Sequence, residues 1–397
     1  MISKRTSVFV TGVAIAAAGI YAETRLSGDT SLPKADPVAT AVQKGVKWLV
    51  SVQGKDGGWG QDGGETSYVR QGERLESSGN DVANTAVAAE ALLHTGNTPT
   101  SGEYREALQR AVAFILRNVE QSPAGGLAVT DRTGTQIQRK LGPYIDTFLT
   151  SRLLAELDGT MGDARSNARV RQSLEKCVAK VEKHQLQDGS WNIAGGWAPI
   201  LGTSMASRSL DLARQKGVAV SPVILAKVDD YTQQAAQPAP AAGPVAGRSA
   251  GIAAGVMTAA GSRPALSASA GVSLYQGAQA LEQLSRTDAD RKKNARQIDA
   301  IKDQLSDARF VTGFGSMGGE EFFSYLNISD SLHRTGGPQW EKWNNDIKAR
   351  VLQMQNEDGT WAGHHCITGR VAVTSAAILT LMAEHDQTVQ STSFKRN

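Results

Sequence analysis

A seven-residue pattern, Gln-x-x-Asp-Gly-x-Trp, constrains the fold of this chain more than any other feature. It occurs three times, and its glutamines and tryptophans are Gln53 and Trp59, Gln185 and Trp191, and Gln355 and Trp361. The segments on both sides of each copy have apolar residues at the spacing of amphipathic helices. The Asp-Gly step breaks a helix, because glycine adopts the positive φ of a tight turn without steric cost. The pattern therefore predicts a repeated unit of outer helix, turn and inner helix.

Six such units fit along the chain. The inner helices are predicted to start near Asp81, Pro143, Pro199, Ala265, Glu320 and Arg370. A small hydroxyl residue recurs within each of them: Thr85, Thr147, Thr203, Ser269, Ser324 and Thr374. The outer helices, such as 291–306 and 340–350, carry more charge, as solvated faces do. We expect an all-α fold of about twelve helices in six hairpins, an α/α toroid, although periodicity alone does not distinguish a closed ring from an open solenoid.

The N-terminal segment, residues 1–22, has the layout of a secretory signal peptide. Lys4 and Arg5 precede an uncharged stretch of 17 residues, which ends in a small-residue cleavage site just before Glu23. An uncleaved anchor is the alternative, since that stretch is near the lower limit for spanning a bilayer. We expect an exported protein, periplasmic or secreted, that contacts a membrane only through this segment.

The rest of the chain is predicted to be a toroid domain over residues 38–385 and a polar tail over 386–397. An Ala/Pro/Gly-rich segment, 233–255, is a poor helix former and is interpreted as a flexible surface loop. A linker between two three-unit halves is the alternative. The net charge of +3 and the absence of a long basic run exclude nucleic acid as an expected partner. Two cysteines are too few for a disulfide scaffold or a four-cysteine zinc module.

A resemblance to a known family becomes specific at residues 44–59, Lys-Gly-Val-Lys-Trp-Leu-Val-Ser-Val-Gln-Gly-Lys-Asp-Gly-Gly-Trp. This stretch resembles the QW repeat of squalene–hopene cyclases and the related prenyltransferase/squalene oxidase repeats. The resemblance spans about residues 38–385. It implies the six-hairpin α/α toroid shared by the cyclase catalytic domain and the protein prenyltransferase β subunits.

The catalytic motifs of that family are not retained. The cyclases protonate an alkene with an Asp-x-Asp-Asp-Thr-Ala motif at the start of an inner helix, whereas this chain has Ala83 and Asn84 at the second and third acidic positions. The remaining Asp81 is predicted to be a helix N-cap. The protein prenyltransferases hold zinc with Asp, Cys and His of the last inner helices, and Val373 and Thr374 stand where the histidine is needed. We therefore expect neither cyclisation nor a cofactor.

Several polar and aromatic residues remain at the turn side of the units. His364-His365-Cys366 is a metal-like trio, but consecutive residues cannot all reach one ion, so we expect an ordered loop and no metal. The ligand-binding candidates at this side are Tyr144, Asp146, Trp197, Glu320, Glu321, His364, His365 and Arg370. A salt bridge from Glu321 to Arg370 that only closes the ring is the competing interpretation.

Two classes of function are consistent with these features. The first is a non-catalytic exported toroid that binds a hydrophobic small molecule or a partner protein in or over the central cavity. The second is a divergent enzyme acting on an isoprenoid, a terpenoid or a polysaccharide, since fold alone does not decide function. The lining of the cavity discriminates between ligands: aromatic walls favour a polyprenyl chain, and paired carboxylates flanking a groove favour a sugar chain.

Overall fold

The computed structural model describes residues 36–61, 79–193, 199–235, 270–308, 311, 318–364 and 366–385. The described residues form 14 α-helices and no β-strand, and Trp59 and Asp81 form an isolated bridge. The predicted all-α class is therefore confirmed. The predicted signal segment, the polar tail, Trp197, Ser269 and His365 lie outside the described residues. In the described residues no helix is both long and apolar enough to cross a membrane.

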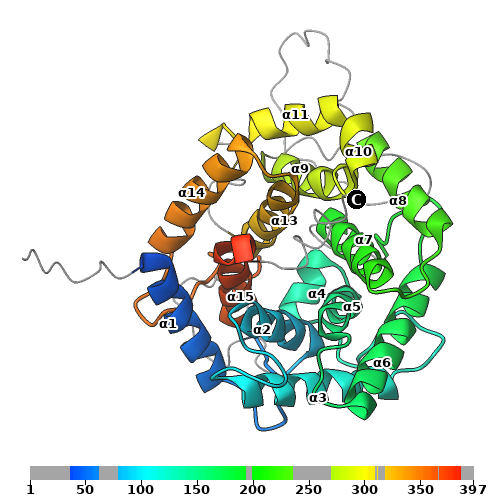
Figure 1. Cartoon of the computed structure of the whole chain (residues 1–397), viewed down its shortest axis with the longest axis vertical. Helices are drawn as coiled ribbons and strands as arrows, with labels where there is room; N and C mark the ends of the chain where they lie inside the picture. The colour runs from blue at the N-terminus through cyan, green and yellow to red at the C-terminus, as the bar shows by residue number, and fades with distance from the viewer. Residues whose placement is uncertain are drawn as a thin grey trace, which may run out of the picture. The chain divides into compact units, whose positions relative to one another are not determined.

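Six helices form a closed inner ring within the unit Pro37–Asn397 (Figure 1). They are α2 (Val82–His94), α5 (Ile145–Leu157), α7 (Pro199–Gln215), α9 (Ala270–Leu284), α13 (Gly319–Thr335) and α15 (Arg370–Leu381). Each packs against the next, and α15 packs against α2. Ring closure, which periodicity left open, is therefore decided by the contact between the first and last inner helices.

An outer ring of helices surrounds the inner one (Figure 1). It consists of α1 (Pro37–Ser51), α3 (Arg105–Gln121), α6 (Ala164–Lys183), α8 (Pro222–Ala235), α10 (Asp288–Lys293) with α11 (Ala295–Gln304), and α14 (Pro338–Gln353). The outer helices bury one face, whereas every residue of α5 is buried. An inner helix meets two ring neighbours, an outer helix and the ring centre, so it has no face left for solvent.

The positions of the helices differ from the predicted ones in three places. The described residues contain two more helices than expected, because α4 (Gln136–Leu141) precedes α5 and the outer helix of the fifth unit is divided at Asn294. Residues 233–235 belong to α8 rather than to the predicted loop. In the fourth unit, α9 begins at Ala270, five residues beyond the predicted start. The segment 236–269 lies outside the described residues.

The tryptophans of the repeated pattern join each turn to both helices of its hairpin. The indole Nε1–H of Trp59, Trp191 and Trp361 donates to a carbonyl of the preceding outer helix at 2.7 Å in every case. Their backbone N–H groups donate to the hydroxyls of Thr85, Thr203 and Thr374 at 2.8, 3.1 and 3.0 Å. The recurring hydroxyl of the inner helices is therefore an acceptor for a buried N–H that would otherwise lose a hydrogen bond.

The glutamines of the pattern join neighbouring hairpins. Gln53 Nε2 donates to Gly57 O of its own turn and to Ala107 O of α3, both at 2.9 Å. Gln185 makes the same pair of bonds to its turn and to α8. Gln355 Nε2 donates to Ala41 O of α1 at 2.8 Å, so the last turn is tied to the first outer helix and the ring closes.

Glycine is required in these turns for two reasons. Gly359 has a φ of +87°, which L side chains rarely adopt. A Cβ at this position would also lie 2.7 Å from Cβ of Lys44 in α1. The Asp-Gly step therefore allows both the turn and the close approach of the next outer helix.

Candidate functional site

The turn-side end of the inner ring is covered by the short helix α4. Thr135 caps this helix, and its neighbour Gln136 reaches the segment before α15. Gln136 Nε2 donates to Thr368 Oγ1 at 2.8 Å, and its Oε1 accepts from the backbone N–H groups of Thr368 and Gly369 at 2.9 and 3.0 Å. At the other end of α4, Leu141 O approaches α7 so closely that a Cβ on Gly202 would lie only 2.4 Å from it. Helix α4 therefore links the second, third and sixth units over this end.

Asp146 lies beneath that cover and is fully buried. Its Oδ1 accepts from the backbone N–H of Ala83 at 3.1 Å, and its Oδ2 accepts from Gln138 Nε2 at 2.7 Å. Burial and the neighbouring carboxylate of Asp81 raise the pKa of Asp146 to about 7. Asp81 accepts from the backbone N–H and the side-chain amide of Asn84, both at 2.8 Å, which confirms its predicted role as an N-cap. Asp146 thus joins the starts of two adjacent inner helices.

Glu320 and Glu321 occupy the first turn of α13, and both are fully buried. The backbone N–H of Ile367 donates to Glu320 Oε2 at 3.4 Å, so the start of α13 meets the segment that leads into α15. The first turn of a helix favours carboxylates through the helix dipole. These two residues lie inside the protein rather than on an open rim.

The remaining predicted site residues in the described part of the chain are Arg370, Tyr144 and His364. Arg370 forms an ion pair with Asp358 at 2.9 Å and lies over the ring of Trp48, 5.1 Å from its centroid. It therefore faces the first outer helix. Tyr144 is half-buried at the start of α5, and His364 is exposed. A common binding site for these residues stays a prediction.

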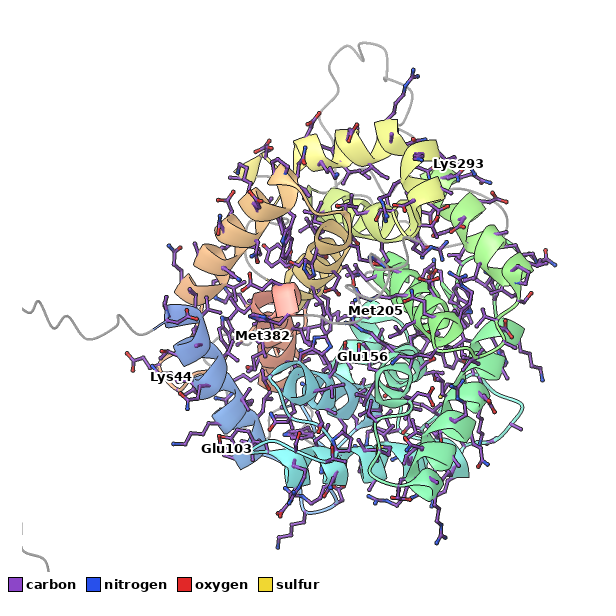
Figure 2. All side chains as sticks on the ribbon, viewed as in Figure 1. Lys44, Glu103, Glu156, Met205, Lys293 and Met382 are labelled. Atoms are coloured by element: carbon purple, nitrogen blue, oxygen red, sulfur yellow. The ribbon has the colours of Figure 1, made fainter. Side chains whose placement is uncertain are left out.

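Charged side chains meet at the centre of the inner ring, in the C-terminal halves of its helices. Arg152 of α5 lies 2.5 Å from Glu90 of α2 and 3.4 Å from Glu156 of α5. The same guanidinium lies 3.6 Å from Asp330 of α13, the helix on the opposite side of the ring. Figure 2 shows Glu156 within the inner ring. The ring centre at this level is therefore crossed by ion pairs.

The ion pairs continue around the ring through α7, α9 and α13. Arg208 contacts both Asp330 and Glu282, and Arg334 lies 2.5 Å from Glu282. Glu282 is fully buried, and burial raises the pKa of its carboxyl group, but Arg334 and Arg208 outweigh this effect and lower it to about 2. Burial raises the pKa of Glu90 to about 8, against the opposing effect of Arg152. Buried charges are tolerated when they are paired in this way.

The sequence did not predict this network, although it contains a signal for it. Glu90, Arg152 and Arg208 each stand five residues after the recurring threonine of their inner helix. A charge at a fixed position of an otherwise apolar, small-residue helix requires a partner, since burying it alone is costly. Which charges pair across the ring depends on ring closure, which the repeats alone did not determine.

The described residues place one set of metal-binding donors at the edge of this network. Glu90, His94 and Glu156 each offer one ligand atom, and these atoms lie within 4.8 Å of one another. In the described part of the chain neither cysteine contributes to such a set. Cys177 and Cys366 are both buried and form no disulfide. Burial raises the pKa of the Cys177 thiol to about 12, against the effects of Lys180 and Lys176, which disfavours the reactive thiolate.

The outer surface also has hollows. One of about 320 Å³ lies between α11 and α14, with Leu305, Trp343 and Ile347 in its wall. Another of about 510 Å³ lies between the starts of α3 and α6. Both lie outside the inner ring.

Comparison with known families agrees with this architecture. Residues 20–142, less than a third of the chain, match the model of the squalene-hopene cyclase C-terminal domain. The matched segment contains the first Gln-x-x-Asp-Gly-x-Trp turn and the start of α2. No curated protein matches the chain. The matched segment is therefore similar to the squalene-hopene cyclase C-terminal domain, and the described residues of the chain form a closed ring of helical hairpins, an α/α toroid.

Proposed function

We propose that this chain is an exported, non-catalytic toroid that binds a polar ligand or a partner protein over one end of its ring. The binding end is the one at which the inner helices finish. The other end is covered by α4 through Gln136 and Leu141. This proposal keeps the binding role expected from the sequence but shifts the ligand from a hydrophobic molecule to a polar one.

The ion pair between Arg152 and Asp330 carries this proposal. A polyprene cyclase must enclose a long hydrocarbon in its ring, and such a ligand gains free energy only by contact with apolar walls. At this level the space is occupied by guanidinium and carboxylate groups from α5, α7, α9 and α13. Hydrocarbon binding there would separate buried ion pairs, which costs several kcal/mol for each uncompensated charge. A ligand with charged or hydrogen-bonding groups suffers no such loss.

The residues at the cyclase acid position also favour a non-catalytic role. Ala83 is buried and has no acidic group, and Asn84 donates to the carboxylate of Asp81. Alkene protonation needs an acid that is much stronger than an ordinary carboxyl group, because a carbocation must form.

Two measurements on the purified chain test the proposal. Incubation with squalene and with a linear polyprenyl diphosphate, followed by mass spectrometry of the extract, is expected to give no cyclised product. Native mass spectrometry of the protein is expected to detect a polar co-purified ligand or a bound protein partner, lost in Arg208→Met. Formation of a cyclic product that depends on Asp81 would contradict the proposal.

Export is proposed from the N-terminal sequence, in which Lys4 and Arg5 precede an uncharged stretch. Expression in a bacterium with an intact secretion system should yield a mature protein that begins at Glu23. N-terminal sequencing of the periplasmic or secreted fraction measures this directly. An uncleaved protein in the membrane fraction would support the anchor alternative.

A second candidate function rests on the carboxyl group of Asp146. Its pKa of about 7 means that it holds a proton near neutral pH, as a general acid must. The alternative is therefore a divergent enzyme that acts on an isoprenoid, a terpenoid or a polysaccharide. Both oxygens of Asp146 accept hydrogen bonds from the protein, which favours the structural role. A turnover that Asp146→Asn abolishes, with the fold intact, would favour the enzyme.

A further inference from the structure

We propose that Glu90, His94 and Glu156 form a zinc-binding site at the end of the ring, with two helices supplying the ligands. Its test does not depend on the proposed binding function, although Arg152 takes part in both regions. The site lies on the first two inner helices, whereas the protein prenyltransferases, which the sequence resembles, hold zinc on the last ones.

The geometry of the three donors supports the site. Glu90 and His94 are four residues apart on α2, so their side chains project from the same face of the helix. Glu156 reaches them from the adjacent helix α5, and all three donor atoms lie within 4.8 Å of one another. Ligands around a tetrahedral zinc ion are separated by about 3.3 Å, from bond lengths of about 2.0 Å. The donors therefore need only small side-chain movements to surround the ion.

The existing contact between two of the donors marks the position of the ion. His94 Nε2 lies 2.8 Å from Glu156 Oε2, the distance of a hydrogen bond. Zinc would replace the proton that these two atoms share, and the pair would open by about half an ångström. Such a contact between imidazole and carboxylate is compatible with a site that takes up either a proton or a metal ion.

Arg152 contacts both carboxylates of the site. Its guanidinium lies 2.5 Å from Glu90 Oε1 and 3.4 Å from Glu156 Oε1, whereas His94 faces Glu156 Oε2. Groups that hydrogen-bond to the ligands of a metal fix their orientation and affect affinity. Arg152 is therefore a positioning residue of the site.

One of the three donors lies close to solvent. The side chain of His94 is 9% exposed, at the last residue of α2, which leaves a path from solvent.

Isothermal titration calorimetry of the metal-stripped chain with ZnCl₂ alone tests the site. We expect one high-affinity zinc ion per chain and a rise in melting temperature on binding. His94→Gln and Glu156→Gln should each weaken binding at least about ten-fold. His184→Gln is the matched control, because that imidazole contacts Lys180 O on the outer helix α6, and it should bind zinc as the unchanged chain does. Equal binding by His94→Gln and the control would overturn the proposal.

A second measurement gives a signal even where a variant is less stable. Co²⁺ bound to His94→Cys should show a near-ultraviolet sulfur-to-metal charge-transfer band that the unchanged chain lacks. The same band in Co²⁺-loaded unchanged chain would place the metal at a native cysteine such as Cys366 and would also overturn the proposal. Zinc binding by a chain on which native mass spectrometry detects no other ligand or partner would support the zinc site and contradict the proposed binding function. A polar ligand on a chain that binds no zinc would contradict the zinc site alone.

Discussion

The ion pairs across the ring centre give the sharpest test of the architecture, and Arg152→Met is the variant of choice. The Arg152 side chain is 5% exposed, and it contacts carboxylates on three inner helices. Methionine retains an apolar stem of similar length, so the change removes mainly the charge. Loss of one partner from a buried ion pair costs about 3–5 kcal/mol, because the other partner keeps a buried, uncompensated charge. We expect the free energy of unfolding to fall by about that amount.

The matched control is Arg169→Met on the outer helix α6. Arg169 pairs with Glu120 at 2.9 Å, but both side chains are 43% exposed. An exposed pair of this kind contributes about 0–1 kcal/mol. The two variants remove the same functional group and differ in burial, so their difference isolates the buried network.

Urea denaturation followed by circular dichroism measures both losses. The double variant Arg152→Met with Asp330→Leu should recover part of the lost free energy of unfolding, because it removes one of the carboxylates that Arg152→Met leaves uncompensated. It should not recover all of it, since Asp330 also balances Arg208. If Arg152→Met costs no more than Arg169→Met, Arg152 is not held between opposite helices and the description of the ring centre is wrong.

Further predictions concern the turns, the buried acid and the thiol. Trp361→Ala should cost about 3–5 kcal/mol by urea denaturation, since the indole is fully buried, and a loss below about 1 kcal/mol would show a surface residue. Thr374→Val should cost about 1–3 kcal/mol by leaving a buried N–H without an acceptor, whereas Thr374→Ser should cost less. Asp146 binds its proton more tightly in the folded than in the unfolded protein, so the free energy of unfolding should fall as the pH rises from 3.8 toward about 7. In Asp146→Asn that fall should be smaller, and a pH profile equal to that of the unchanged chain would contradict the raised pKa of Asp146. Cys177 should resist iodoacetamide in the folded protein, as intact-mass spectrometry can measure, and rapid alkylation would show that it is accessible.

The sequence by itself determined the repeating unit. The Asp-Gly step, the apolar helices and the recurring hydroxyl are local features, and each acts within one hairpin, as the bonds from Trp361 to Thr374 and Val351 do. The starts of α2, α7, α13 and α15 were predicted within a residue or two for this reason. The N-cap role of Asp81 was likewise local and is confirmed.

Only the tertiary structure decided how the hairpins are joined and what fills the ring. The bond from Gln355 to Ala41 joins residues at opposite ends of the toroid domain, and no periodic pattern specifies such a contact. Helix α4 was missed because it is a single short insertion that breaks the repeat. The pair between Arg152 and Asp330 depends on two helices facing each other across a closed ring. A charge pairs with whatever the closed fold brings to it, so its partner is a property of the tertiary structure rather than of the local sequence.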